Sequence, residues 1–172
     1  MGKNTQDKTI LITREFSSGG IVFKKEPETL HWLIRKTAAS NVYPNQYWML
    51  PKGRVDDTDG DLPGPMASGK IKADENSLKN AALREVAEET GVEGKIVEKI
   101  GTIKYVFTDP LRGKIMKFVT FYLMEWVRDL SEGFDGETSE IAWLPYDKAL
   151  ETLSFRGEKQ VLKKASQLLA SI

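Results

Sequence analysis

The sequence predicts an α/β fold in which a mixed β-sheet lies between helices, as an α/β/α sandwich. Three observations predict it. Residues 76–90 are rich in alanine, leucine, lysine and glutamate, which favour a helix. Residues 114–127 read as a strand that is apolar on both faces, and such a strand must be covered on both sides of its sheet. Residues 156–169 form an amphipathic helix whose apolar stripe suits such a cover.

Length and composition are those of one globular domain over residues 1–172, large enough for a substantial core. The 25 basic and 25 acidic residues balance, so nothing indicates a nucleic-acid or membrane-surface binder. The chain has no cysteine, which excludes disulfides and thiolate metal sites. Residues 1–8 lack an apolar signal core, and no apolar run is long enough to span a membrane. We expect a cytoplasmic protein, and its oligomeric state stays open.

The chain begins with strands. We expect a short strand over 10–12 and a longer one over 17–25, whose glycines permit close approach of another backbone. Residues 29–36 follow after a turn and form a hairpin with it. The only histidine, His31, lies inside this strand beside Trp32, where a structural or surface role is favoured over a catalytic one.

The segment 47–54, YWMLPKGR, follows a polar loop. Its residues 47–50 read as a short buried strand that Pro51 ends. Gly53 can adopt backbone conformations that are closed to other residues. Lys52 is a compact cation that is well placed for a phosphate. Residues 57–73 are rich in glycine, proline and aspartate and have no periodicity, so we expect a mobile loop.

The second half of the chain adds strands and ends in helices. We expect a long strand over 95–108 with a break at Gly101, followed by a turn and the returning strand 114–127. A loop over 129–140 then leads into a short strand with the sequence IAWLP. Two helices close the chain, one starting at Tyr146 and the amphipathic one over 156–169.

The helix over 76–90 carries the chemistry. Asp74, Asn76 and Ser77 are its candidate N-caps, and Gly91 suits the left-handed position past its end. At helical spacing Glu85, Glu88 and Glu89 fall within an arc of about 100° beside an apolar stripe. Like charges at this spacing repel, and Arg84 can reach only one or two of them. Carboxylate oxygens suit Mg²⁺ or Mn²⁺, so the stripe indicates a divalent-cation site; the alternative is a solvated charged face.

The segment Arg84 to Val92, REVAEETGV, resembles the end of the Nudix box, the signature of the Nudix (MutT-like) hydrolases, at every position. The PKGR motif at 51–54 resembles the start of that box. The resemblance implies a Nudix-type α/β/α sandwich and a metal-dependent hydrolase of a nucleoside diphosphate linked to another group. It further implies a set of metal ligands, Glu85, Glu88, Glu89 and the Gly53 carbonyl, and it implies that Arg84 orients a box glutamate by ion pairing.

The chain departs from the family pattern between these two motifs. The family has a glutamate at the position that Asn76 occupies here, and residues 57–73 fit as an insert in the box. The family's glutamate has a structural or secondary role. Glu75 and Asp56 are both candidates to replace it.

The resemblance extends to other site residues. A further carboxylate of the family, a base or an extra ligand, comes from the loop before the last strand, and Glu137 is favoured over Glu140 for it. The position of Arg35 often faces substrate phosphates, although a surface cation is an equal alternative. Tyr105, Phe107 and Tyr122 could stack on an adenine, although aromatic residues in strands more often belong to the core.

The substrate is less sharply indicated. The segment 143–165, WLPYDKALETLSFRGEKQVLKKA, and the strand KFVTFYLMEW resemble the bacterial branch around dinucleoside polyphosphate hydrolases, which makes a diadenosine or dinucleoside polyphosphate the first choice. The second choice keeps the enzyme and changes the substrate to ADP-ribose, an oxidised nucleotide or an inositol pyrophosphate. The third is a non-catalytic Nudix domain that binds nucleotide as a sensor. In every case the partner is a small-molecule nucleotide or polyphosphate.

Overall fold

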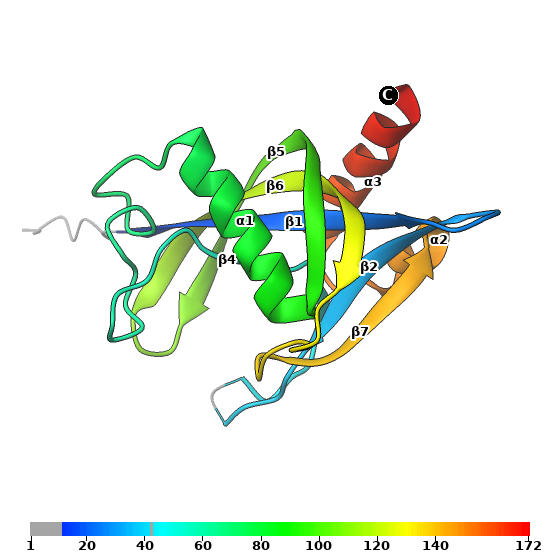
Figure 1. Cartoon of the computed structure of the whole chain (residues 1–172). Coiled ribbons are helices and arrows are strands. Elements are labelled where there is room, and N and C mark those ends of the chain that lie inside the picture. Colours follow the sequence, from blue (N-terminus) through cyan, green and yellow to red (C-terminus); the bar gives the residue numbers. More distant parts are fainter. Residues whose placement is uncertain (1–11, 42) are drawn as a thin grey trace, which may run out of the picture.

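The computed structural model describes residues 12–41 and 43–172. A seven-stranded sheet carries helix α1 on one face and helices α2 and α3 on the other (Figure 1). The predicted α/β/α sandwich is therefore confirmed. Within the described ranges, no helix combines the length and the apolar character that crossing a membrane requires. The cytoplasmic location stays a prediction.

The elements follow the predicted order. The strands are β1 (Thr13–Lys25), β2 (Leu30–Thr37), β3 (Trp48–Met49), β4 (Lys52–Arg54), β5 (Val92–Asp109), β6 (Gly113–Asp129) and β7 (Thr138–Pro145). The helices are α1 (Glu75–Thr90), α2 (Tyr146–Thr152) and α3 (Arg156–Ser171). Of the short strand expected over 10–12, residues 10 and 11 lie outside the described residues. The strand expected over 47–50 is shorter, and a second one, β4, follows its proline.

The sheet is mixed, as predicted. Its main strand order is β3-β2-β1-β6-β5, with β1 and β6 parallel and the other neighbours antiparallel. Strand β7 extends it beside β2, and the short β4 pairs with β1 so that Gly53 lies opposite Ser18. This pairing brings the PKGR motif under α1.

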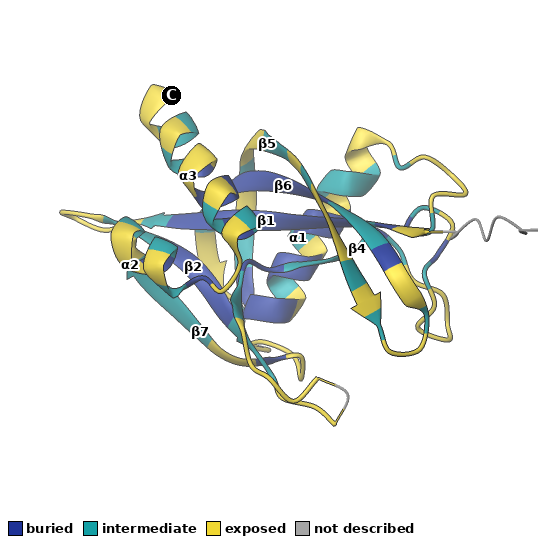
Figure 2. Cartoon of the chain, turned by 180° about the vertical axis from the view of Figure 1, so that it is seen from behind, coloured by how far each residue is buried: buried dark blue, intermediate teal, exposed yellow. Residues whose placement is uncertain are grey.

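Alternate residues of the central strands pack into two separate cores. On β6, Tyr122 and Met124 join the core under α1, whereas Phe121 and Leu123 join the core under α2 and α3. Figure 2 shows both central strands, β1 and β6, as largely buried. The strand that is apolar on both faces is thus covered on both faces, as its sequence predicts.

Helix α1 is delimited by its caps. The Asp74 carboxylate accepts a hydrogen bond from the Ser77 amide (2.7 Å), which fixes the first turn. Gly91 ends the helix in the left-handed conformation, with φ 69° and ψ 25°. A side chain there would also collide with the backbone of Gly133, so glycine is required for two reasons.

The insert 57–73 contains neither helix nor strand, apart from one isolated bridge between Asp57 and Pro63, and all of its residues are described. Its second half is nevertheless fixed. The Asp56 carboxylate accepts hydrogen bonds from the amides of Met66 (3.1 Å) and Ala67 (2.7 Å), and the Phe16 amide of β1 donates to the Ala67 carbonyl (2.8 Å). This part of the expected mobile loop is therefore a wall that is hydrogen-bonded to the sheet.

Candidate active site

The site forms where α1 packs over β4. Glu85 and Glu89 lie on the buried side of the helix, and their residues are 8% and 2% exposed. Gly53 of β4 lies directly below Glu85, and a Cβ at this position would overlap the Glu85 carboxylate. Only a glycine lets the backbone of β4 come this close to α1.

Glu89 is held from two sides. Its Oε1 accepts a hydrogen bond from the Lys52 amide (3.0 Å), and its Oε2 lies 2.9 Å from Nη1 of Arg35. Arg35 is itself buried and donates through Nε to Thr138 Oγ1 and through Nη2 to the Glu137 carbonyl, both at 2.7 Å. Arg35 is thus no surface cation. Its fixed guanidinium sets the orientation of the Glu89 carboxylate.

Arg84 lies at the solvent side of the same helix. Its Nη2 donates to the Arg54 carbonyl (2.8 Å) and to Glu85 Oε1 (3.2 Å), and its Nε lies 3.9 Å from Glu88 Oε1. Arg84 therefore ties the helix to β4 and contacts two of the three predicted carboxylates. Its guanidinium is partly exposed, so solvent screens its attraction for Glu85.

The site is short of positive charge. Burial raises the pKa of Glu85 to about 7, and the negative charges of Glu88 and Glu137 add to the rise while Arg84 opposes it. Burial likewise raises the pKa of Glu89 to about 8 against the opposing charge of Arg35. Both carboxylates would ionise fully at neutral pH if a further cation came close.

The residues fit a divalent metal ion, although they are not yet arranged as a complete ligand set. Within the described ranges, no three acidic or histidine side chains converge on one point. Glu85 and Glu89 are buried together, whereas the Glu88 side chain is 52% exposed and turned toward Arg84. Gly53 lets the Glu85 carboxylate lie directly over β4, and the oxygen-only donor set suits Mg²⁺ or Mn²⁺. A complete set requires Glu88 to rotate inward.

The loop before β7 brings one more acid near this pair. The charge of Glu137 contributes to the raised pKa of Glu85, and its side chain is exposed. Glu140 lies farther along β7, opposite Lys36 of β2. Of the two candidates for the extra carboxylate, Glu137 is the one whose charge raises the pKa of Glu85, and its role stays a prediction.

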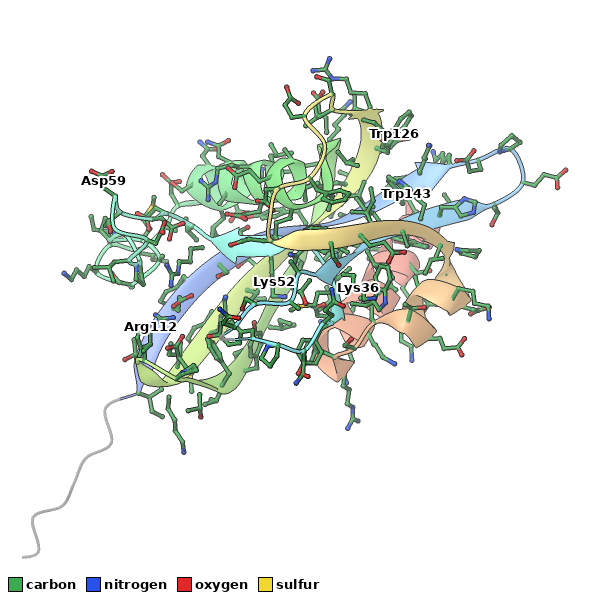
Figure 3. The ribbon with its side chains drawn as sticks, turned by 90° about the horizontal axis from the view of Figure 1, so that it is seen from below. Lys36, Lys52, Asp59, Arg112, Trp126 and Trp143 are labelled. Atoms are coloured by element: carbon green, nitrogen blue, oxygen red, sulfur yellow. The ribbon has the colours of Figure 1, made fainter. Side chains whose placement is uncertain are left out.

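Lys52 does not extend its side chain toward these carboxylates. Its Nζ lies on the α3 side of the sheet (Figure 3), 2.6 Å from Oε2 of Glu158, and both side chains are buried. Burial lowers the pKa of Lys52, but Glu158 more than offsets this and the pKa is raised overall. Lys52 is therefore a structural cation here, because β4 alternates and points Lys52 away from the side on which Gly53 meets α1.

Glu158 is the residue that sequence reasoning missed. Its Oε1 also accepts the Leu50 amide (2.8 Å), so it supports the backbone on both sides of Pro51. The signal was available: Glu158 shares the buried stripe of α3 with Val161 and Ala165 at helical spacing.

Tyr122 and Tyr105, the two tyrosines predicted to contact a base, differ in their exposure. Tyr122 is fully buried under α1, and its hydroxyl donates to Glu75 (2.7 Å), so its ring is closed to a stacked base. Burial raises the pKa of Tyr122 further above its usual range. Tyr105 is 37% exposed on the other face, with its ring 6.1 Å from that of Phe107, and can still accept a base.

The candidates for the missing box glutamate have other partners. Glu75 binds Tyr122 and Lys99 at the start of α1, and Asp56 binds the insert. Neither contacts Glu85 or Glu89 by a described hydrogen bond. His31 lies on β2 opposite Lys24, outside the site.

Comparisons with known proteins agree with this fold. The family profile of the NUDIX domain matches residues 13–165. A protein provisionally named mutator protein MutT4, from Mycobacterium tuberculosis, is 33% identical over 117 residues, which are 68% of this chain. The match covers 46% of that relative, so the chain corresponds to about half of its length.

Solved structures share the fold at low sequence identity. A Caenorhabditis elegans Ap4A hydrolase in a binary complex has a TM-score of 0.63 at 18% identity, covering 92% of this chain and 99% of that one. The NUDIX domain of Shewanella oneidensis NrtR, complexed with ADP ribose, has a TM-score of 0.62 at 18% identity, covering 96% and 94%.

Proposed function

The chain belongs to the Nudix hydrolase family, and we propose that it is a metal-dependent pyrophosphohydrolase acting on a nucleoside diphosphate linked to another group. One observation carries the proposal: two buried carboxylates, Glu85 and Glu89, each have an arginine beside them and still have raised pKa values. A helix face that served only solubility would keep such groups exposed. The family profile spans residues 57–73, which we propose are an insert within a single domain.

Glu85, Glu88, Glu89 and the Gly53 carbonyl would hold the metal. A bound divalent ion neutralises phosphate charge and lowers the pKa of water, which is the chemistry that attack on a polyphosphate needs. The chain's own contribution is position. Arg35 and the Lys52 amide hold the two oxygens of Glu89, and Arg84 holds Glu85 against β4.

Glu137 is the residue that we assign as general base. Its side chain is exposed, and its negative charge contributes to the raised pKa of Glu85. In the proposed step, water attacks phosphorus, its proton passes to the Glu137 carboxylate, and the phosphoric anhydride bond breaks toward the leaving phosphate. Arg35 holds the carbonyl of the same residue and so fixes the base relative to Glu89.

The finer proposal is a diadenosine or dinucleoside polyphosphate. It is supported by the resemblance of the last strands and helices to that branch and by the shared fold with an Ap4A hydrolase. The shared fold with a domain complexed with ADP ribose supports the alternative of ADP-ribose as substrate. The third candidate, a nucleotide sensor without catalysis, has no need of three acids crowded at Glu85, Glu88 and Glu89.

Product identification by mass spectrometry tests the proposal. The protein is incubated with Mg²⁺ and, separately, diadenosine tetraphosphate, ADP-ribose, oxidised dGTP and an inositol pyrophosphate, in ¹⁸O-water to mark the attacked phosphorus. ATP plus AMP from the first substrate, formed fastest, is the expected result. Faster turnover of another compound would change the proposed substrate and leave the proposed mechanism in place. Tight nucleotide binding without turnover would establish the sensor instead.

A further inference from the structure

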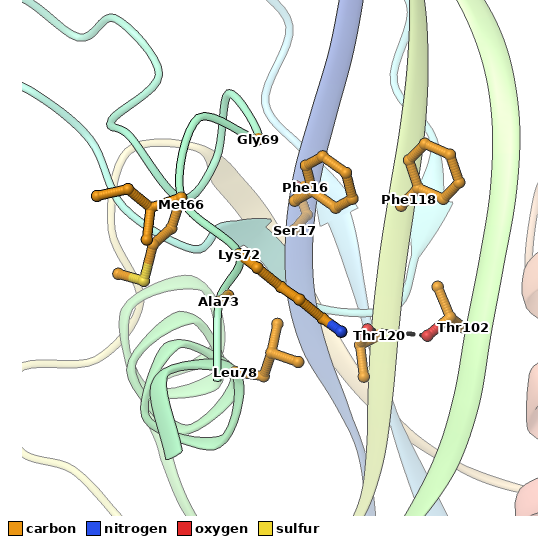
Figure 4. Close-up of a pocket in the computed structure, with 11 residues that line it drawn as sticks. Phe16, Ser17, Met66, Gly69, Lys72, Ala73, Leu78, Thr102, Phe118 and Thr120 are labelled. Carbon is orange, nitrogen blue, oxygen red and sulfur yellow. Dashed lines mark hydrogen bonds between the residues drawn. The ribbon is translucent and has the colours of Figure 1, made fainter. Parts of the chain in front are cut away.

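A cavity lies on the α1 side of the sheet, apart from the carboxylate site (Figure 4). Its volume is about 260 Å³, and it lies between the insert, strands β1, β5 and β6, and the first turn of α1. Nothing in the proposed chemistry uses it. Its mostly apolar walls with a few polar groups are those of a site for a small organic group.

The insert builds one wall of this cavity. It supplies five of the eleven lining residues, namely Met66, Gly69, Ile71, Lys72 and Ala73. The wall is held in place by Asp56, whose carboxylate fills the space that Gly64 leaves and accepts the Met66 and Ala67 amides. The Ile71 amide also bonds back to the Pro65 carbonyl (3.0 Å). The insert that interrupts the family motif thus has a defined surface facing the sheet.

The cavity has an apolar body and a polar end. Phe16 and Phe118 stack with ring centroids 5.0 Å apart and form one side. At the other end the hydroxyls of Thr102 and Thr120 lie 2.9 Å apart, and the ammonium of Lys72 extends across the opening toward them (Figure 4).

These groups define the ligand. Lysine only donates hydrogen bonds, and threonine hydroxyls donate or accept, so the ligand must offer acceptors along one edge. The apolar walls require the rest of it to be a flat or compact apolar body. A polyphosphate does not fit, because one ammonium among apolar walls cannot replace its hydration. A nucleobase fits, since its ring nitrogens and carbonyl groups lie on the edge of an apolar ring.

The cavity lies within reach of the carboxylate site. Leu78 lines it from α1, and Glu85 follows seven residues later on the same face of the helix, about 10 Å along its axis. We propose that the cavity holds the nucleobase at the far end of the substrate, the one joined to the leaving polyphosphate. The identity of the ligand rests on the proposed function. On that function, the insert is the element that selects substrates with two nucleosides.

Binding of free adenosine to the metal-free protein tests the site without any catalysis. We expect saturable binding in calorimetry, weakened about tenfold in Lys72→Ala, which loses the ammonium, and abolished in Thr102→Trp, which fills the cavity. Lys70→Ala is the matched control, since it removes the same charge from the same insert outside the cavity. Thermal melts establish that each variant is folded. Absence of saturable binding, or equal affinity in all four proteins, would overturn the site.

Kinetics test its role in the substrate. Lys72→Ala should raise KM for diadenosine tetraphosphate about tenfold and leave kcat unchanged, with no change in KM for a nucleoside triphosphate, which has no second nucleoside. An unchanged KM together with weakened adenosine binding would overturn the assignment to the substrate. If no substrate is hydrolysed, the proposed function fails, and the adenosine experiment still decides whether the site exists.

Discussion

Two buried acidic sites in this chain have opposite electrostatics. Glu15 on β1 is surrounded by three cations, Arg112 at 2.8 Å, Arg54 at 3.2 Å and Lys117 at 3.6 Å. Burial alone would raise the pKa of Glu15, but these cations more than offset it and the pKa is lowered. The Glu85 and Glu89 pair is buried to a similar degree, and its pKa values are raised to about 7 and about 8.

The two sites differ in the number of cations that contact each carboxylate. The chain neutralises Glu15 with its own side chains, which is what a structural site needs. At α1 it supplies Arg35 and a partly exposed Arg84 for two carboxylates, with Glu88 and Glu137 nearby. Buried acids that a protein leaves undercompensated are characteristic of functional sites. We therefore propose the α1 pair as the place for an added cation and Glu15 as its structural counterpart.

Glu89→Gln should have the largest effect on activity. We expect a loss of roughly two orders of magnitude in Mg²⁺-dependent kcat, as for other groups that stabilise charge at a reacting centre, with the fold retained. Hydrolysis rates and circular dichroism measure the two properties. Unchanged activity would remove Glu89 from the metal site.

Glu158→Gln probes a third buried acidic site, where one cation, Lys52, contacts the carboxylate. The variant leaves the Lys52 ammonium buried without its partner, so we expect unfolding to become easier by about 3 kcal/mol in urea melts. Mn²⁺ affinity, followed by electron paramagnetic resonance, should fall because Lys52 and Gly53 carry the backbone under Glu89 and Glu85. The double variant Lys52→Met/Glu158→Gln should recover stability. Destabilisation with no change in Mn²⁺ affinity would leave Glu158 without a positioning role.

Glu15→Gln should lower stability and leave activity unchanged, which is the converse of the result expected for Glu89→Gln. Three cations lose their shared carboxylate, and we expect a cost of about 2 kcal/mol, less than for a fully buried pair because the cations are partly exposed. The activity per folded molecule should remain. A specific loss of activity in the folded variant would show that Glu15 takes part in the reaction.

The pH dependence of stability should separate the two sites. Glu85 and Glu89 have folded-state pKa values above the ordinary 4.5, so the folded state holds more protons than the unfolded state. Without metal, the free energy of unfolding should therefore fall as pH rises from about 4.5 to about 8. Glu15, with its lowered pKa, contributes stability above 4.5 that is lost as pH falls through its folded value.

Thermal melts across this range, in chelator and in Mg²⁺, measure the effect. Mg²⁺ should reduce the fall between pH 6 and 8, because it stabilises the ionised carboxylates. A flat profile in chelator would contradict the raised pKa values. In Glu15→Gln the same melts should still show stability falling above pH 6. The fall should be no steeper than in the parent protein.

The sequence predicted what depends on local pattern. Helix α1 and the shared arc of Glu85, Glu88 and Glu89 follow from spacing and caps, and the two-sided burial of β6 follows from its composition. The partners of these residues could not be predicted, because they come from distant strands. Arg35 reaches Glu89 only once β2, β7 and α1 are packed, and Thr138 completes that contact.

Lys52 shows where reasoning from sequence fails. Its place beside Gly53 suggested a phosphate contact, whereas the alternation along β4 sends neighbouring side chains to opposite faces. The short length of β4 concealed this alternation. Composition alone predicts a mobile loop for the insert. Its hydrogen bonds to Asp56 and β1 are tertiary contacts, which composition does not reveal.

Calorimetry of Mn²⁺ binding at pH 7.5, with the parent protein, Glu89→Gln and Glu15→Gln, decides whether the α1 pair, and not Glu15, lacks a cation. We expect at least tenfold weaker Mn²⁺ binding in Glu89→Gln and parental affinity in Glu15→Gln. Parental affinity in Glu89→Gln, or an equal loss in both variants, would contradict this assignment.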